Sequence, residues 1–181
     1  YYMNDNEPSV EKIDSLITLY SNGKPQKVVD EINELEKKFK SSPLLFNIKG
    51  ACYIALGQMY NAIDSYEHAV ALKPDYADSH YNLGNSLRAI DKLEESIQSY
   101  ANAISALPEF FEAAFNLSVS LMDLGRINEA IEKFERALLI KPDDIDSRIN
   151  LGSLHQHNSD YAEAILQYEE ILKIDSTNYE A

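Results

Sequence analysis

The sequence predicts an all-α fold, an α-solenoid built from tandem helix-turn-helix repeats. Two observations lead to this prediction: several residue types recur every 34 residues, and apolar stripes with helical spacing lie between them. A fixed period of this length is typical of proteins whose small helical units stack into one continuous core. The recurring columns are Pro74, Pro108 and Pro142, Ile63, Ile97, Ile131 and Ile165, Tyr66, Tyr100, Phe134 and Tyr168, and Ala69, Ala103 and Ala137.

Each unit has the pattern of two helices joined by a tight turn. In residues 77–110 the first helix carries His80, Leu83 and Leu87 on one apolar face. A turn with a left-handed residue is expected at Asp91, because glycine stands there in related units. The second helix begins near Leu93 and ends before the proline at position 108. The residues in the place of Asp91 are Gly57, Gly125 and Ser159.

Small residues predict where the two helices of a unit approach closely. Gly84 and Ala103 leave space at this crossing, and the ring of Tyr100 is expected to fill it. At the other end of the unit, Asp75 and Asp143 directly follow prolines. Aspartate is a favourable N-cap, so both are predicted to cap the helix that begins there.

The period divides the chain into a tail, five repeats and the beginning of another. Residues 1–8 are an N-terminal tail, and the repeat at 9–42 is degenerate, with its first helix shifted by one residue. Residues 179–181, Tyr-Glu-Ala, match Phe-Glu-Ala at 111–113, which open a repeat. We therefore expect a truncated further repeat and a fragment of a longer protein. The complete repeats are predicted at 43–76, 77–110, 111–144 and 145–178.

This pattern resembles the signature of the tetratricopeptide repeat family. The resemblance rests on Asn82-Leu83-Gly84, Tyr100, Ala103 and Pro108 in one repeat, and on Leu117, Gly125, Ala130, Phe134, Ala137 and Pro142 in the next. It implies a right-handed superhelix with a concave peptide-binding groove. The chain is most similar to the superhelix of O-linked N-acetylglucosamine transferase-like proteins, in which a ladder of asparagines holds peptide backbone.

Three asparagines form the corresponding candidate ladder. Asn82, Asn116 and Asn150 recur at the repeat period, on the flank opposite the core stripe. An amide can both donate and accept, so a row of amides can bind the backbone of an extended peptide. The alternative is that asparagine is a tolerated polar residue at this place. In repeat 43–76 Ile48 takes the place and Asn47 lies one residue earlier. Lys49 replaces a leucine, and its stem is expected to snorkel.

Further residues are predicted to line the same groove. Helical geometry places Tyr81, Asn85 and Arg88 opposite the core stripe of their helix, and Phe115, Val119, Met122 and Ile149 are the corresponding candidates of the next two repeats. Ile54 could extend this patch. Acidic residues such as Asp78, Glu112 and Asp146 edge it. We expect a protein or peptide ligand with an apolar anchor and basic or neutral flanks, unless another part of the parent protein covers the patch.

Composition excludes several classes of function. The net charge of −14 argues against nucleic acid and anionic membranes as partners. No apolar run is long enough for a membrane span. The single Cys52 fits a reducing, cytoplasmic compartment, and we expect it to be buried. No catalytic motif or cofactor site is recognisable, and His155 and His157 are two residues apart, so they cannot share a metal on a helix.

The sequence therefore predicts a non-enzymatic protein-interaction module. Two alternatives stay open. The chain could be the substrate-recruiting arm of a glycosyltransferase-like enzyme whose catalytic domain lies outside it. It could also be a scaffold that self-associates through the uncovered ends of its repeats.

Overall fold

The computed structural model describes residues 7–178, and this part of the chain contains ten helices and no strand. The helices divide between two compact units, residues 1–90 with α1 to α5 and residues 91–181 with α6 to α10. The predicted opening of a further repeat at 179–181 lies outside the described residues. The helices are α1 (Val10–Ser21), α2 (Pro25–Leu35), α3 (Pro43–Ala55), α4 (Met59–Leu72), α5 (Ala77–Ala89), α6 (Leu93–Ala106), α7 (Phe111–Asp123), α8 (Ile127–Ile140), α9 (Ile145–His157) and α10 (Tyr161–Asn178).

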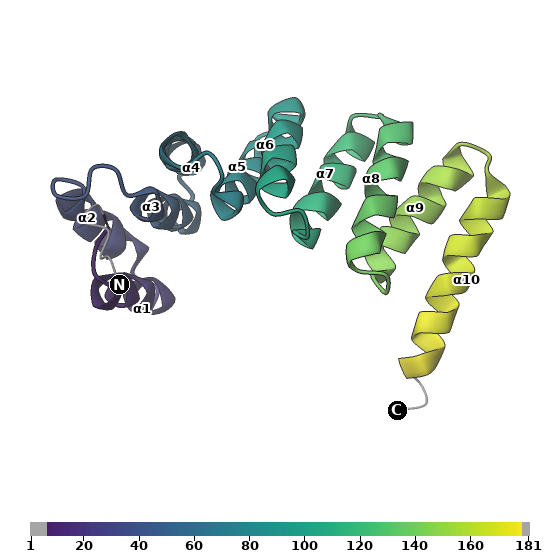
Figure 1. Ribbon diagram of the computed structural model, residues 1–181, viewed down its shortest axis with the longest axis horizontal. Coiled ribbons are helices and arrows are strands. Elements are labelled where there is room, and N and C mark those ends of the chain that lie inside the picture. The colour runs from purple at the N-terminus through teal and green to yellow at the C-terminus, as the bar shows by residue number, and fades with distance from the viewer. Residues whose placement is uncertain (1–6, 179–181) are drawn as a thin grey trace. The chain divides into compact units, whose positions relative to one another are not determined.

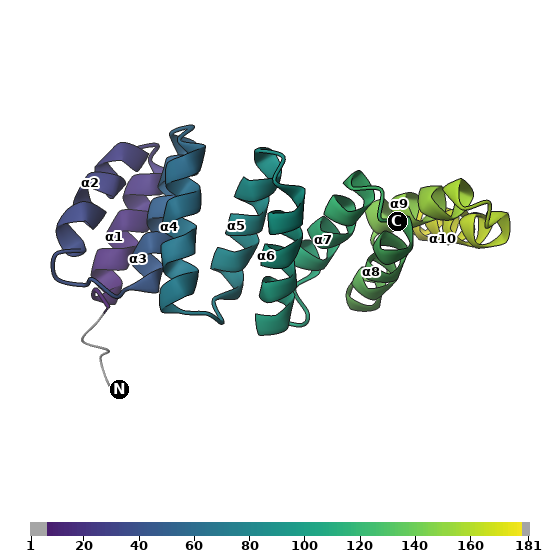
Figure 2. The ribbon, with the colours of Figure 1, turned by 90° about the horizontal axis from the view of Figure 1, so that it is seen from above.

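Within each unit, every helix packs against its neighbours in the chain. In the first unit α1 contacts α2, α2 contacts α3, and the series continues to α5 (Figures 1 and 2). The second unit repeats this arrangement from α6 to α10. Such nearest-neighbour packing defines an all-α helical repeat, as the 34-residue period predicted. The repeat boundaries themselves stay predictions.

The predicted left-handed turns are confirmed. Gly57 and Gly125 have φ of 71° and 72°, and the non-glycine residues Asp91 and Ser159 have φ of 62° and 64°. After Gly57, the Gln58 amide donates to the Tyr53 carbonyl at 2.8 Å and closes the end of α3. Gly23, with φ of 70°, has the same role in the first repeat. These five residues follow one another at intervals of 34.

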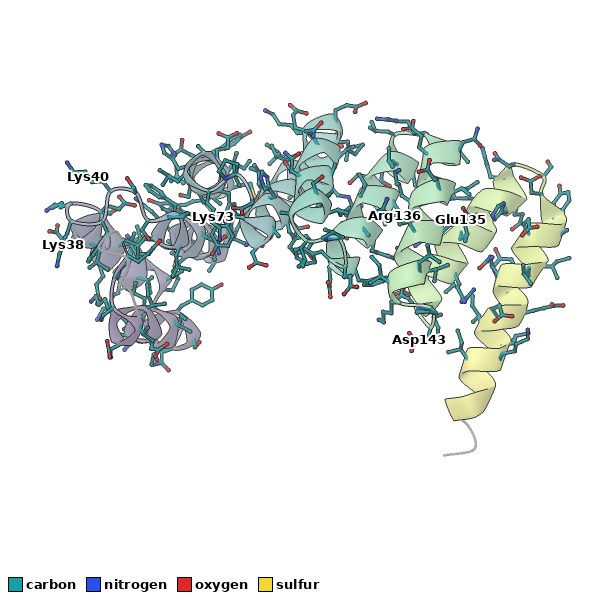
Figure 3. All side chains as sticks on the ribbon, in the orientation of Figure 1. Lys38, Lys40, Lys73, Glu135, Arg136 and Asp143 are labelled. Carbon is teal, nitrogen blue, oxygen red and sulfur yellow. The ribbon has the colours of Figure 1, made fainter. Side chains whose placement is uncertain are left out.

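The predicted helix caps were wrong by one residue. The N-caps of α5 and α9 are Tyr76 and Asp144, and not Asp75 and Asp143. The Asp144 carboxylate accepts from the Ser147 amide at 2.9 Å and from the Ser147 hydroxyl at 2.8 Å. The Asp144 amide in turn donates to the Lys141 carbonyl, so Pro142 and Asp143 form the middle of a turn beyond the end of α8 (Figure 3).

The cap positions confirm the shift predicted for the first repeat. The N-caps of α1 and α3 are Ser9 and Ser42, which are 33 residues apart. From Ser42 onward the N-caps Tyr76, Phe110 and Asp144 follow at intervals of 34. The first helix of the first repeat therefore begins one residue later, relative to the period, than the other first helices.

A helical glycine allows close approach of two helices inside both units, whereas the crossing predicted at Gly84 stays a prediction. A Cβ built on Gly50 would lie 2.5 Å from Cε1 of Tyr66, and one on Gly152 would lie 2.8 Å from Cε1 of Tyr168. Tyr66 is only 3 % exposed, and Ala69, Ala103 and Ala137 are fully buried. The aromatic ring of the second helix thus occupies the space that the missing side chain leaves on the first.

Lys49 departs from the prediction. Its ammonium group does not snorkel into solvent but pairs with the Glu36 carboxylate at 2.9 and 3.0 Å. The two side chains are only 14 % and 22 % exposed. The pair joins α3 to the residue that caps α2, beside a core of Leu16, Ile32 and Leu45.

Two glycine substitutions test the close approach. We expect Gly50→Ala to lower the free energy of unfolding by about 1–2 kcal/mol, because overpacking of ~1–3 kcal/mol exceeds the helix propensity gained. Gly152→Ala is the matched control. Tyr168 is 37 % exposed and can move aside, so its effect should be smaller. Urea denaturation followed by circular dichroism measures both values, and equal losses would contradict this account.

Two aspartate substitutions test the cap of α9. Burial raises the pKa of Asp144, but the hydrogen bonds from Ser147 and Lys141 outweigh it and leave the pKa below its ordinary value. Asp144 therefore stabilises the fold above about pH 4, and this contribution disappears as the pH falls through the lower folded pKa. At pH 7 we expect Asp144→Ala to cost ~1–2 kcal/mol and Asp143→Ala to cost little. A urea midpoint that responds more to Asp143→Ala would refute the assignment.

Candidate functional site

The first unit contains a groove that is lined entirely by uncharged residues. Its volume is about 370 Å³, within the range of small ligand sites. Side chains from α1, α3, α4 and α5 form it, so it lies where several helices of this unit meet. The lining residues are Tyr20, Ala51, Ile54, Met59, Tyr66, Asn82, Asn85, Ser86 and Ala89.

The floor of the groove is apolar and partly open to solvent. Tyr20 and Ile54 are 39 % and 40 % exposed, so part of each side chain is open to solvent. Tyr66 is buried beneath them, and burial raises its pKa far above the ordinary value for tyrosine, so its hydroxyl stays protonated. The groove therefore offers apolar contact and neutral hydrogen-bonding groups.

Two predicted site residues, Asn82 and Asn85, come together at this groove. The Asn82 amide donates to Oδ1 of Asn47 on α3 at 3.3 Å, and the Ser79 hydroxyl donates to the same oxygen at 2.9 Å. Asn47 was not part of the predicted ladder, because it lies one residue before the periodic place. The structure nevertheless brings its amide next to Asn82, so one hydrogen of Asn82 already has an acceptor within the protein.

The remaining candidates on α5 are placed differently. Tyr81 and Arg88 are half-buried and do not line the groove. Ile54, predicted as an extension of the patch, does line it. Tyr20 and Met59 were missed: Tyr20 belongs to the degenerate repeat, and Met59 opens a second helix, which the groove prediction did not consider.

In the second unit, Phe115 contributes to packing between helices. Its ring lies edge-on to the fully buried Phe134 of α8, with centroids 5.8 Å apart, and 6.1 Å from Phe111. Val119 and Met122 on the same helix are half-buried. The apolar patch predicted for α7 is therefore partly a component of the core.

The two asparagines of the second unit lie on α7 and α9. Asn116 is half-buried. The Asn150 amide donates to the Asp146 carbonyl one turn earlier at 2.9 Å, and the neighbouring Ile149 is 47 % exposed. A continuous row through Asn82, Asn116 and Asn150 stays a prediction, and so does the role of each residue in binding.

The cysteine and histidine side chains discussed above lie apart from one another in the described part of the chain. Cys52 is fully buried, as predicted, and burial raises its pKa to about 11. His155 is buried, with Nδ1 3.8 Å from the Asp160 carboxylate, whereas His157 is exposed. Among the side chains that the structure describes, those of residues 7–174, no group of three or more is suited to hold a metal ion. No helix within that range is long and apolar enough to cross a membrane.

Solved structures with the same architecture include those of MamA and of YrrB. A crystal structure of MamA superposes with a TM-score of 0.85 at 21 % identity, covering 93 % of this chain and 92 % of that one. MamA from Desulfovibrio magneticus RS-1, residue 41 to the end, gives 0.79 at 17 % identity and covers 91 % and 93 %. YrrB, described as a TPR protein with an unusual peptide-binding site, gives 0.78 at 18 % identity and covers 94 % and 88 %. At these identities the similarity shows the fold alone.

Sequence comparison identifies the family. No curated protein sequence matches the chain. A TPR repeat model matches residues 50–91, and a tetratricopeptide repeat model matches residues 77–145 and 115–179. Because these matches together span residues 50–179 of the 181, the chain belongs to the tetratricopeptide repeat family.

Proposed function

We propose that this chain binds an extended peptide segment, and that the groove of the first unit takes an apolar anchor residue of that peptide. Tetratricopeptide repeats act as protein–protein interaction modules. The observation that carries the proposal is the uncharged groove, in which the amides of Asn82 and Asn85 border exposed Tyr20 and Ile54. An apolar floor selects an anchor, and a neighbouring amide can bind peptide backbone whatever the side chain.

The net negative charge of the protein supports basic or neutral residues on either side of the peptide's anchor. The chain carries 30 acidic and 16 basic side chains. None of the groove residues is charged, so a charged anchor would lose its hydration without gaining a partner. Basic or neutral residues on either side of the anchor would meet a predominantly acidic surface. The ligand is thus an apolar anchor with basic or neutral flanks.

Two comparisons support the proposal that the chain binds the backbone of a peptide. YrrB has the same fold and is described as having a peptide-binding site. The asparagine ladder of O-linked N-acetylglucosamine transferase-like proteins is the model for Asn82, Asn116 and Asn150. A compartment with reduced thiols, such as the cytoplasm, agrees with the buried Cys52.

Selection from a displayed random peptide library tests the proposal. We expect peptides that share an aliphatic or aromatic anchor and lack acidic flanks. In fluorescence anisotropy, the double variant Tyr20→Ser, Ile54→Ser should bind a selected peptide at least about tenfold more weakly, because two apolar contacts are lost. Tyr60→Ser is the matched control, since Tyr60 is 75 % exposed and lies outside the groove. Unchanged affinity in the double variant would refute the anchor site.

The asparagine row needs a separate test. Replacing Asn82, Asn116 and Asn150 together by alanine should weaken the same peptide about tenfold or more, since each net hydrogen bond contributes ~0.5–1.5 kcal/mol. The single variants show which amides contribute. If the triple variant binds as well as the parent chain, the asparagines are tolerated polar residues and only the anchor site remains.

A further inference from the structure

A small hydrogen-bonded network joins α3 to α5 beside the groove of the first unit. Oδ1 of Asn47 accepts from the Asn82 amide at 3.3 Å and from the Ser79 hydroxyl at 2.9 Å. Asn47 lies one helical turn before Ala51, which lines the groove, but Asn47 itself does not line it. Asn47 therefore stands behind the groove wall and is bonded to a residue of that wall.

The orientation of the Asn47 amide follows from another neighbour, Tyr76, the N-cap of α5. Burial and the Asp78 carboxylate raise the pKa of the Tyr76 hydroxyl, and a hydrogen bond from Asn47 opposes this rise without cancelling it. A bond that lowers the pKa of a phenol must be donated to its oxygen, so Nδ2 of Asn47 is directed to Tyr76. The oxygen of the Asn47 amide is thereby left as the acceptor for Ser79 and Asn82.

The network also fixes the side chain of Asn82, which lines the groove. Its Nδ2 donates to Asn47, and the oxygen and nitrogen of an amide lie on different sides of the same carbon, so Oδ1 of Asn82 is directed away from Asn47. The Ser86 hydroxyl donates to the main-chain carbonyl of Asn82 at 2.8 Å and not to this oxygen. Oδ1 of Asn82 is therefore the acceptor that this side chain offers to a peptide.

We propose that Asn47 is a positioning residue that holds Oδ1 of Asn82 as an acceptor, so that the groove selects a peptide with a main-chain N–H beside its apolar anchor. This inference rests on the proposed peptide binding and adds the direction of one hydrogen bond to it. Proline and N-methylated residues have no main-chain N–H, so the groove should reject them at this place. There the Asn82 oxygen would lose its water without gaining a donor.

N-methyl scanning of a peptide selected from the displayed library tests the inference. We expect one N-methyl group next to the anchor to weaken binding to the parent chain about tenfold, because the Asn82 oxygen is left without a donor. In Asn47→Ala the unmethylated peptide should bind about tenfold more weakly, and the same N-methyl group should then cost about twofold or less, since Asn82 is no longer held. A merely structural loss would lower the affinity for both peptides equally.

Three further variants control this experiment. Asn47→Asp keeps an oxygen that accepts from Ser79 and Asn82, so it should restore the discrimination against the N-methyl group. Asn47→Leu keeps the branched shape without the polar atoms, and it replaces Asn47→Ala if circular dichroism shows that the latter is unfolded. Asn61→Ala should change neither affinity, because exposed Asn61 donates to Gln58 at 2.8 Å outside the groove.

Other outcomes would overturn the inference. The positioning role is wrong if the N-methyl group costs the same affinity in the parent chain and in Asn47→Ala, or if every N-methylated peptide binds fully. If the double variant Tyr20→Ser, Ile54→Ser still binds weakly in that case, the groove stands and only the role of Asn47 is lost. If the double variant binds normally, or if the library yields no binding peptide, the proposed peptide binding fails and this inference fails with it.

Discussion

The architecture of this chain depends on the burial of an apolar stripe on second helices such as α4. The stripe of α4 is covered by Leu83 and Leu87 of α5, and the buried ring within it, Tyr66, also fits against Gly50 of the preceding helix. One aromatic side chain therefore connects three successive helices. Because the same arrangement recurs along the chain, stability accumulates from contacts between neighbours, without a single central core.

The proposed binding groove is formed by helix surfaces that are not used for packing between neighbouring helices. A helix that uses two of its sides for its neighbours has a third side to present to solvent. In the first unit that surplus surface meets at Tyr20, Ile54 and the amides of α5 and forms an uncharged groove. The chain has a net charge of −14, whereas the residues that line this groove are all uncharged, and the proposed apolar anchor follows from that contrast.

Features encoded by local sequence could be predicted. The turn residues at 57, 91 and 125 depend on a few neighbouring positions that repeat with the period. The cap prediction for α9 failed because aspartates stand at 143 and 144 in succession, and only the turn geometry after Pro142 decides which one caps the helix. The period predicts the register of each repeat, but it does not predict the backbone conformation of the segment that joins one repeat to the next.

The candidate site was less predictable because it depends on packing between repeats. Asn47 lies off the period, yet its side-chain oxygen accepts a hydrogen bond from Asn82 of the next first helix. The position of Phe115 on its helix predicted a groove residue, but its ring packs edge-on against the buried ring of Phe134. Tyr20 lines the groove from α1, the helix that is shifted by one residue relative to the period, so the period did not predict its place. Each of these placements needs the relative position of two helices.

The ion pair between Lys49 and Glu36 has a consequence for how similar helices choose their neighbours. Lys49 stands where the other repeats have Leu83, Leu117 and Leu151, so α3 alone among these first helices places a charge at that interface. Packed on a second helix without a carboxylate at that point, the lysine would be enclosed without a counter-ion, at considerable cost. The ion pair therefore favours the packing of α3 on α2 over its packing on a second helix that has no carboxylate at this point.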